Sequence, residues 1–121
     1  MKKPRQIIGK WGENVAAEYL LNRGWTIIAR NLRTPFGELD LIAGKADVLV
    51  FFEVKTRTNN AFGLPEEAIT PAKATHLLES SQFFLQQHPE LEGDWRVDVI
   101  AIQGKPDVPG TRIEWFENVL S

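Results

Sequence analysis

The chain contains no cysteine and only two histidines, His76 and His88, among its 121 residues. The absence of cysteine excludes a disulfide framework and zinc sites built on thiolates. Two histidines are too few for a histidine-rich metal site, and we interpret both as surface residues of a helix. A catalytic metal would therefore be held mainly by oxygen ligands, which favours Mg²⁺ or Mn²⁺ over zinc.

Long hydrophobic runs are absent as well. The first residues are basic, but glycines and charges at positions 9–13 interrupt the segment after them, so no secretory signal is expected. No apolar run reaches membrane-spanning length, so we expect a cytoplasmic protein without a membrane partner. With 43% hydrophobic and 25% charged residues, the chain fits a single folded domain over residues 1–121.

An excess of positive charge is also missing, since the formal net charge is −2. This value argues against a passive nucleic-acid coat, which would be strongly basic. It does not exclude a nuclease, because local basic residues can still face phosphate. Arg33, Arg57 and Lys73 are the residues we expect to contact nucleic acid. Ordinary solvated surface charge is the alternative, and charge alone does not decide between them.

Hydrophobic periodicity predicts the order of the elements. Helical spacing over residues 6–22 indicates a first helix. Thr70 and Pro71 are typical of an N-cap and a first helical residue, so a second helix is predicted from there to about His88. A turn is expected at 44–47 and a loop at 58–64. Strands are predicted over residues 25–33, 37–43, 48–57, 94–103 and 111–116.

The order α-β-β-β-α-β-β predicts an α/β fold with a mixed central sheet flanked by helices. The third strand is the most informative. Residues 48–52 are apolar on both faces, as in a covered central strand. Because strand period is two, Glu53, Lys55 and Arg57 then share one face. Charges at the end of a buried strand destabilise the fold unless they are paired or bind a metal.

The preceding hairpin would bring further acids to that face. If its turn is centred on residues 45–46, Asp40 pairs with Phe51 and Glu38 pairs with Glu53. Asp40 then lies diagonally beside Glu53. Opposed acids repel one another without a counter-ion, and a divalent cation would remove that repulsion. We therefore predict a metal site, although a slip of one residue would move Asp40 to the other face.

The first helix supplies a possible fourth acid and two unexpected glycines. Glu13 lies at the edge of the apolar stripe, within roughly 20° of Leu20 around the axis. Gly9 and Gly12 destabilise a helix interior by up to about 1 kcal/mol each relative to alanine. Close approach of another element or of a phosphate backbone would explain them, and a frayed helix start is the alternative.

Five segments together resemble the YraN-like bacterial family, which is similar to the restriction-endonuclease-like PD-(D/E)XK superfamily and to archaeal Holliday junction resolvases. The resemblance runs from about residue 8 to residue 102. Leu39 stands where the superfamily motif has proline beside its first acid, and Val97 stands where an aromatic residue is typical. The segments are Gly12-Glu13, residues 31–33, residues 37–42, residues 52–57 and residues 96–100.

The resemblance implies metal-dependent hydrolysis of phosphodiester bonds in DNA, with branched or flapped DNA as candidate substrates. Asp40 and Glu53 match the metal-binding acids, with the backbone carbonyl of Val54 as a further ligand. Lys55 matches the catalytic lysine, and Glu13 matches the helix-borne glutamate of the resolvases. By analogy, the enzyme would act as a homodimer.

Other interpretations remain open beside this one. The main alternative is a non-catalytic nucleic-acid- or protein-binding module on the same fold, because fold does not fix function. Asp40, Glu53 and Lys55 would then be ordinary surface charges near strand ends, and Glu13 a helix-surface residue. Arg96 and Asp98, on one strand face, predict a structural salt bridge. Core packing is the expected role of most of the four tryptophans.

Overall fold

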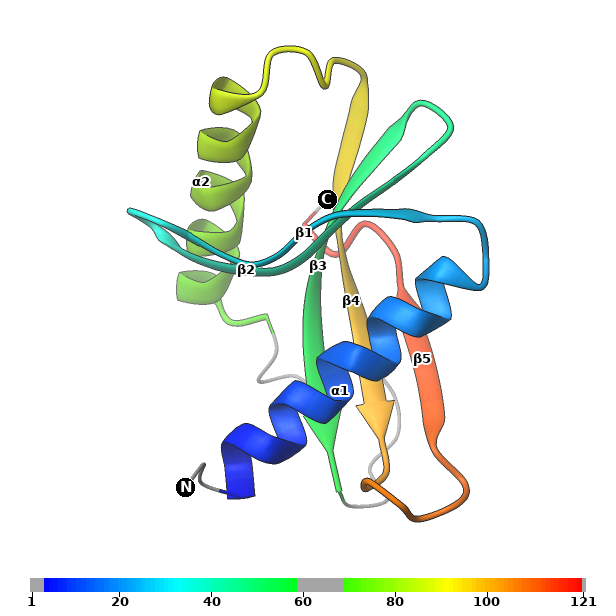
Figure 1. Ribbon diagram of the computed structural model, residues 1–121. Coiled ribbons are helices and arrows are strands. Elements are labelled where there is room, and N and C mark those ends of the chain that lie inside the picture. Colours follow the sequence, from blue (N-terminus) through cyan, green and yellow to red (C-terminus); the bar gives the residue numbers. More distant parts are fainter. Residues whose placement is uncertain (1–3, 59–68, 121) are drawn as a thin grey trace.

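The structure is a computed structural model that describes residues 4–58 and 69–120, with side chains from Gln6 onward. One five-stranded sheet has the order β1-β2-β3-β4-β5, in which β3 and β4 are parallel and the other neighbours are antiparallel. Figure 1 shows the sheet with one helix on either side. The predicted α/β fold and its element order are confirmed. The elements are α1 (Pro4–Leu21), β1 (Thr26–Thr34), β2 (Gly37–Lys45), β3 (Val48–Arg57), α2 (Pro71–Gln87), β4 (Asp94–Gln103) and β5 (Arg112–Phe116).

The start of α2 agrees closely with the sequence prediction. The Thr70 side chain accepts a hydrogen bond from the Lys73 backbone N–H at 3.1 Å, and Pro71 is the first helical residue. A threonine N-cap satisfies an amide that the helix leaves without a partner, and proline at the first position loses no hydrogen bond. The helix ends at Gln87, as predicted to within one residue. The loop prediction at 58–64 lies outside the described residues, except for Thr58.

The register of the β2–β3 hairpin differs from the prediction. Lys45 pairs with Val48, so the two turn residues are Ala46 and Asp47, and Ala43 pairs with Val50. The prediction had centred the turn one residue earlier. Ala46 adopts a positive φ of 53°, which nothing in the residue type indicated. The turn therefore shifts every predicted cross-strand pair by two residues.

The β1–β2 ribbon changes the face it presents near Asp40. Leu39 and Ile42 both pack toward α2, although they are three residues apart, whereas Leu41 packs toward α1. Asn31, on the neighbouring strand, has a φ of 51°, a left-handed conformation that asparagine tolerates better than most residues. Neither the β1–β2 nor the β2–β3 register includes Asp40, within the described strands. Its side chain is therefore positioned by a local irregularity.

Each face of the sheet is covered by one hydrophobic cluster. Ala16, Ala17 and Leu20 of α1 pack on one face, while Leu77 and Phe84 of α2 pack on the other. The tryptophans support these clusters, as predicted: Trp11, Trp25 and Trp115 on the α1 side and Trp95 on the α2 side.

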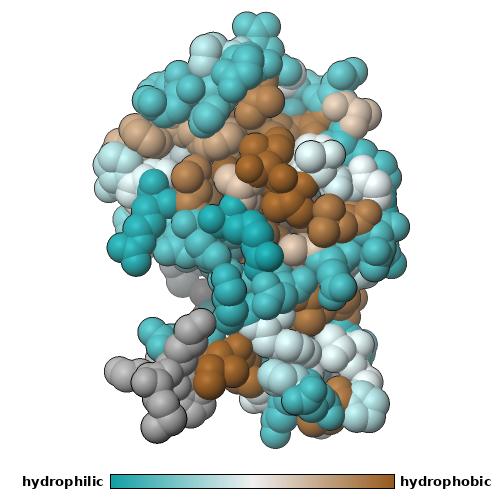
Figure 2. Space-filling model, viewed as in Figure 1, coloured by the Kyte–Doolittle hydropathy of each residue, from teal (hydrophilic) through white to brown (hydrophobic). Residues whose placement is uncertain are grey.

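Some large hydrophobic side chains remain exposed at the surface. Figure 2 shows a face dominated by hydrophilic residues, with hydrophobic ones in a band across its upper half and a smaller group below. Among the described residues, no helix combines the length and hydrophobicity needed to cross a membrane. The exposed large hydrophobic residues in the described part of the chain are Ile7, Leu21, Ile28, Phe36, Leu78 and Val108.

Asp98 is a fully buried acid whose partners are all within the fold. Arg96 Nε donates to its carboxylate at 3.0 Å, and Trp115 Nε1 donates at 2.8 Å. The Asn118 backbone N–H adds a third bond at 2.8 Å. The predicted Arg96–Asp98 salt bridge is confirmed, and this acid ties β4 to β5 and the segment after it.

Candidate active site

The candidate site forms where β2 separates from β3. Their last cross-strand pair is Leu41 with Phe52, but β3 continues beside β4 as far as Arg57. In Figure 1, β2 turns toward α2 while the lower half of β3 runs on along β4. The Val54 N–H finds its acceptor in the Asp40 side chain, with N to Oδ2 at 2.9 Å. The carboxylate thus occupies the gap that the departing strand opens.

Glu53 lies at the same position on β3 and is only 8% exposed. Lys73, near the start of α2, places its Nζ 3.2 Å from Glu53 Oε1. The sequence suggested Lys73 as a phosphate contact or an ordinary solvated charge, and its pairing with Glu53 was missed. A lysine one turn into a predicted helix carries no signal of which distant strand it faces, so this contact required the tertiary structure.

The two acids perturb each other. The pKa of Asp40 is raised from 3.8 to about 7, mainly by burial and then by the negative charges of Glu53 and Glu13, while the Val54 N–H and Lys73 oppose the rise. Burial also raises the pKa of Glu53, and the Lys73 ammonium opposes this. Two neighbouring buried carboxyl groups cannot both ionise readily without added positive charge. Such displaced pKa values occur most often at functional sites.

Buried oxygens without partners add to this need for a cation. Glu53 Oε2 and Glu13 Oε1 have no hydrogen-bond partner among the described residues. A buried unsatisfied acceptor destabilises a protein by about 1–3 kcal/mol, more when charged. Oxygen is also the ligand type that Mg²⁺ and Mn²⁺ prefer. The donor set therefore fits a hard divalent cation.

The protein would supply only part of the coordination shell. Among residues 4–58 and 69–120, no three acidic or histidine side chains lie close enough together to hold one ion. Mg²⁺ is commonly bound through one or two carboxylates and retains several waters, or takes substrate phosphates in their place. Two protein carboxylates, with the remaining coordination positions left to water or phosphate, would match this mode of binding.

An open groove of about 530 Å³ gives access to the acids. Its lining brings together β2, β3 and α1, and all the residues predicted for catalysis or metal binding are in it. The groove contains Glu13, Asp40, Glu53, Val54 and Lys55.

Gly12 explains how α1 comes so close to β3. A Cβ at this position would collide with the side chain of Thr56. The predicted close approach of another element is therefore confirmed at Gly12. The same contact brings Glu13, the next residue, to the edge of the groove.

The other predicted charged residues lie elsewhere. Arg33 is 90% exposed and its Nε lies 3.9 Å from Glu38 Oε2 on the neighbouring strand. The predicted pairing of Glu38 with Glu53 is wrong, because the hairpin register shifts and β2 has left β3 before that point. Arg57 ends β3, where its carbonyl accepts the Gly104 N–H at 2.9 Å. Neither arginine lines the acid groove.

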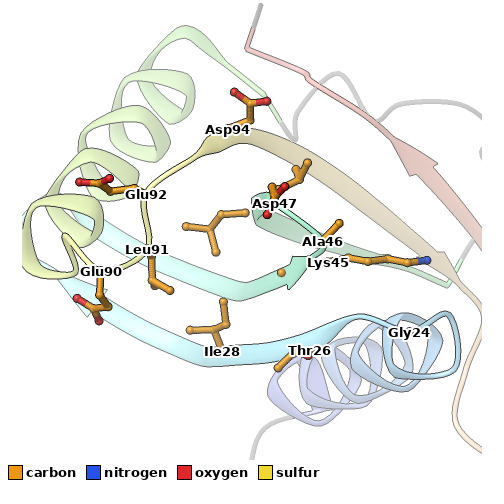
Figure 3. A pocket seen from close by; sticks show the side chains of 13 residues that line it. Gly24, Thr26, Ile28, Lys45, Ala46, Asp47, Glu90, Leu91, Glu92 and Asp94 are labelled. Atoms are coloured by element: carbon orange, nitrogen blue, oxygen red, sulfur yellow. The ribbon is translucent and has the colours of Figure 1, made fainter.

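A second hollow, of about 360 Å³, lies at the β2–β3 turn and the α2–β4 connection. Figure 3 shows Ile28 and Leu91 within it and the carboxylates of Glu90, Glu92 and Asp47 around it. Lys45 extends away and donates to the Arg23 carbonyl at 2.7 Å. These carboxylates would repel a phosphate group brought into the hollow.

Comparison with known proteins identifies relatives along most of the chain. Residues 12–102 match the profile of the uncharacterised protein family UPF0102. A UPF0102 protein of Syntrophomonas wolfei is 44% identical over 78% of this chain and 83% of its own. Another, from Dehalococcoides mccartyi, is 37% identical over 96% of this chain and 94% of its own. A third, from Thermus thermophilus, is 42% identical over 81% and 85%.

Among solved structures, the chain is similar to one described as "The structure of Pyrococcus Furiosus SfsA in complex with Ca2+". The TM-score is 0.41 at 16% identity, covering 93% of this chain. The chain spans 63% of the length of that protein.

Proposed function

The chain belongs to the uncharacterised protein family UPF0102, and we propose that it is a metal-dependent nuclease that hydrolyses phosphodiester bonds in DNA. The observation that carries this proposal is the buried acid pair of Asp40 and Glu53, which shares an open groove with Lys55. A structural ion pair does not account for two neighbouring acids that repel each other. Binding of a divalent cation does, because the cation would neutralise both carboxylates.

Asp40 and Glu53 bind the cation through carboxylate oxygens, and the backbone carbonyl of Val54 is the further ligand that the family resemblance implies. The Val54 N–H holds the Asp40 carboxylate in place. A bound Mg²⁺ or Mn²⁺ would supply Lewis acidity and a water of lowered pKa.

Lys55 and Glu13 serve the reacting phosphate. Lys55 places an ammonium in the groove, where it stabilises negative charge that grows on the phosphate oxygens. Glu13, with its unpartnered buried oxygen, holds a water near the acids. Attack of a water oxygen on phosphorus forms one P–O bond and breaks another, and the leaving oxygen takes up a proton.

Lys73 has a different role in the metal-free protein. Its ammonium already faces Glu53 and partly neutralises the pair. Lys73 and a bound divalent cation would compete for the same carboxylate of Glu53. Lys73 therefore reduces the repulsion between the two acids in the metal-free protein. Its side chain is 40% exposed and can turn toward solvent or a phosphate once the cation is bound.

A binding module without catalysis is the second candidate. The Lys73–Glu53 pair favours it, because Glu53 is already partly neutralised without metal. Against it, an acid pair beside a phosphate-binding groove would weaken binding unless a cation were present.

The test is incubation with linear, flapped and four-way DNA in Mg²⁺ or Mn²⁺, beside the Asp40→Ala protein. The proposal expects cleavage of at least one structure by the wild type and none by the variant. Binding without cleavage of any structure would favour the module. If Asp40→Ala cleaved as fast as the wild type, a contaminating nuclease would be the source of activity.

A further inference from the structure

Gly9 has no structural explanation within the described protein. It lies inside α1, where glycine is a poor helix former. A Cβ built at Gly9 meets no atom within 4 Å among the described residues, whereas one at Gly12 collides with Thr56. Packing therefore requires glycine at position 12 and not at position 9. Among the described residues, the space at Gly9 belongs to open hollows at the surface.

That space connects two hollows. Gly9 and Glu13 line the acid groove and also line a neighbouring hollow of about 760 Å³. The neighbouring hollow reaches Lys10 on α1 and Arg33 on β1. The backbone of α1 at Gly9 is thus a low point between the acid pair and two basic side chains.

The charges on the far side suit a phosphate chain. Lys10 is exposed, and Arg33 is 90% exposed with only a long contact to Glu38 at 3.9 Å. An exposed pair of this kind is weak, so Arg33 can turn to a phosphate with little loss. Glycines also occur where a ligand backbone must approach a protein backbone closely.

We propose that a nucleic acid strand crosses α1 at Gly9, with its reacting phosphate at the acid pair and its neighbouring phosphates at Lys10 and Arg33. This inference rests on the proposed function and adds the path of the substrate. Gly9 acts by leaving room for the strand, and Lys10 acts as a phosphate contact.

The experiment measures DNA affinity and thermal stability together. A fluorescein-labelled single-stranded oligonucleotide and its duplex are titrated, with Ca²⁺ replacing Mg²⁺, against the wild type, Gly9→Ala, Gly9→Gln and Lys10→Gln. Lys105→Gln removes the same charge from an exposed residue that lines neither hollow and is the matched control. Gly12→Ala serves as the contrast for stability.

Gly9→Gln should weaken binding about tenfold or more, and Gly9→Ala less, because the added side chain fills the strand's path. Both should melt at least as high as the wild type, with Gly9→Ala raised by roughly 3–6 °C, since the glycine disfavours the helix. Gly12→Ala should melt lower. Lys10→Gln should reduce the slope of log affinity against log salt by about 0.7 for the single strand, and Lys105→Gln should not.

Wild-type affinity in Gly9→Gln would overturn the inference, and so would a lower melting temperature in Gly9→Ala. Failure of the proposed function looks different. A wild-type protein that binds DNA and loses affinity in Gly9→Gln, but never cleaves, would keep the strand path and remove the nuclease. If the wild type cleaves DNA but Gly9→Gln binds DNA as tightly as the wild type, the nuclease proposal would stand and the strand path would be removed. Absence of DNA binding by the wild type would overturn both.

Discussion

Replacing Asp40 by asparagine should stabilise the metal-free protein, and the gain should grow with pH. The substitution removes one charge from the acid groove and keeps an oxygen that can accept the Val54 N–H. Burial and then the charge of Glu53 raise the pKa of Asp40 from 3.8 to about 7. The folded protein therefore holds this proton more tightly than the unfolded chain does.

The linkage between proton binding and folding sets the sign and the size of this effect on the free energy of unfolding. The stabilising contribution of protonated Asp40 is complete below about pH 3.8 and is lost as the pH rises through about 7. Over that window the loss amounts to at most about 4 kcal/mol in the free energy of unfolding. Asparagine does not ionise, so its advantage over the wild type should widen by up to that amount between about pH 4 and about pH 8.

Urea unfolding monitored by tryptophan fluorescence, in EDTA at several pH values, measures this difference. Asp47→Asn, in the exposed β2–β3 turn, is the matched control for the loss of one carboxylate. Adding Mg²⁺ at pH 8 should then stabilise the wild type, by about 2.7 kcal/mol at a hundredfold excess over Kd, and leave Asp40→Asn unchanged. A pH-independent difference between variant and wild type would show that the acid pair does not raise the pKa of Asp40 in the folded protein.

Three further substitutions separate the roles of neighbouring residues. Lys55→Met should keep the fold and Mg²⁺ affinity but raise the barrier to cleavage by about 2–4 kcal/mol, measured under single-turnover conditions, and a variant as fast as wild type would remove Lys55 from the chemistry. Lys73→Met should raise the pKa of Glu53 further and destabilise the metal-free protein by about 1 kcal/mol, reduced by the partial exposure of Lys73, yet tighten Mg²⁺ binding in calorimetry because the competing ammonium is gone. Weaker Mg²⁺ binding in that variant would contradict the competition, and Lys105→Met is its control. Asp98→Ala should destabilise the fold by about 3–5 kcal/mol in urea, because it removes the buried acceptor of the Arg96, Trp115 and Asn118 N–H groups, and should not change Mg²⁺ affinity per folded molecule.

Local signals predicted the elements well. Short-range patterns predicted the apolar run before Glu53, the start of the helix at Thr70–Pro71 and the order of the strands. The structure has these features at or near the predicted residues. The close approach at Gly12 could also be inferred, because a helix-interior glycine asks for a physical reason.

The features that the sequence did not predict depend on geometry beyond one element. The hairpin register depends on a positive φ at Ala46. The position of Asp40 depends on the left-handed conformation of Asn31 in the neighbouring strand. Lys73 pairs with Glu53 because α2 packs with its first turn beside β3, which no spacing within α2 encodes. Glu38 was misplaced because β2 leaves β3, and strand divergence has no signature in alternation alone.

Anomalous diffraction from crystals soaked in Mn²⁺ at about pH 8 would show whether Asp40 and Glu53 form a divalent-cation site. We expect one strong anomalous peak in contact with oxygens of both carboxylates, with Lys73 displaced from Glu53. Saturating Mn²⁺ with no peak at these acids, and with Lys73 still paired to Glu53, would contradict this expectation.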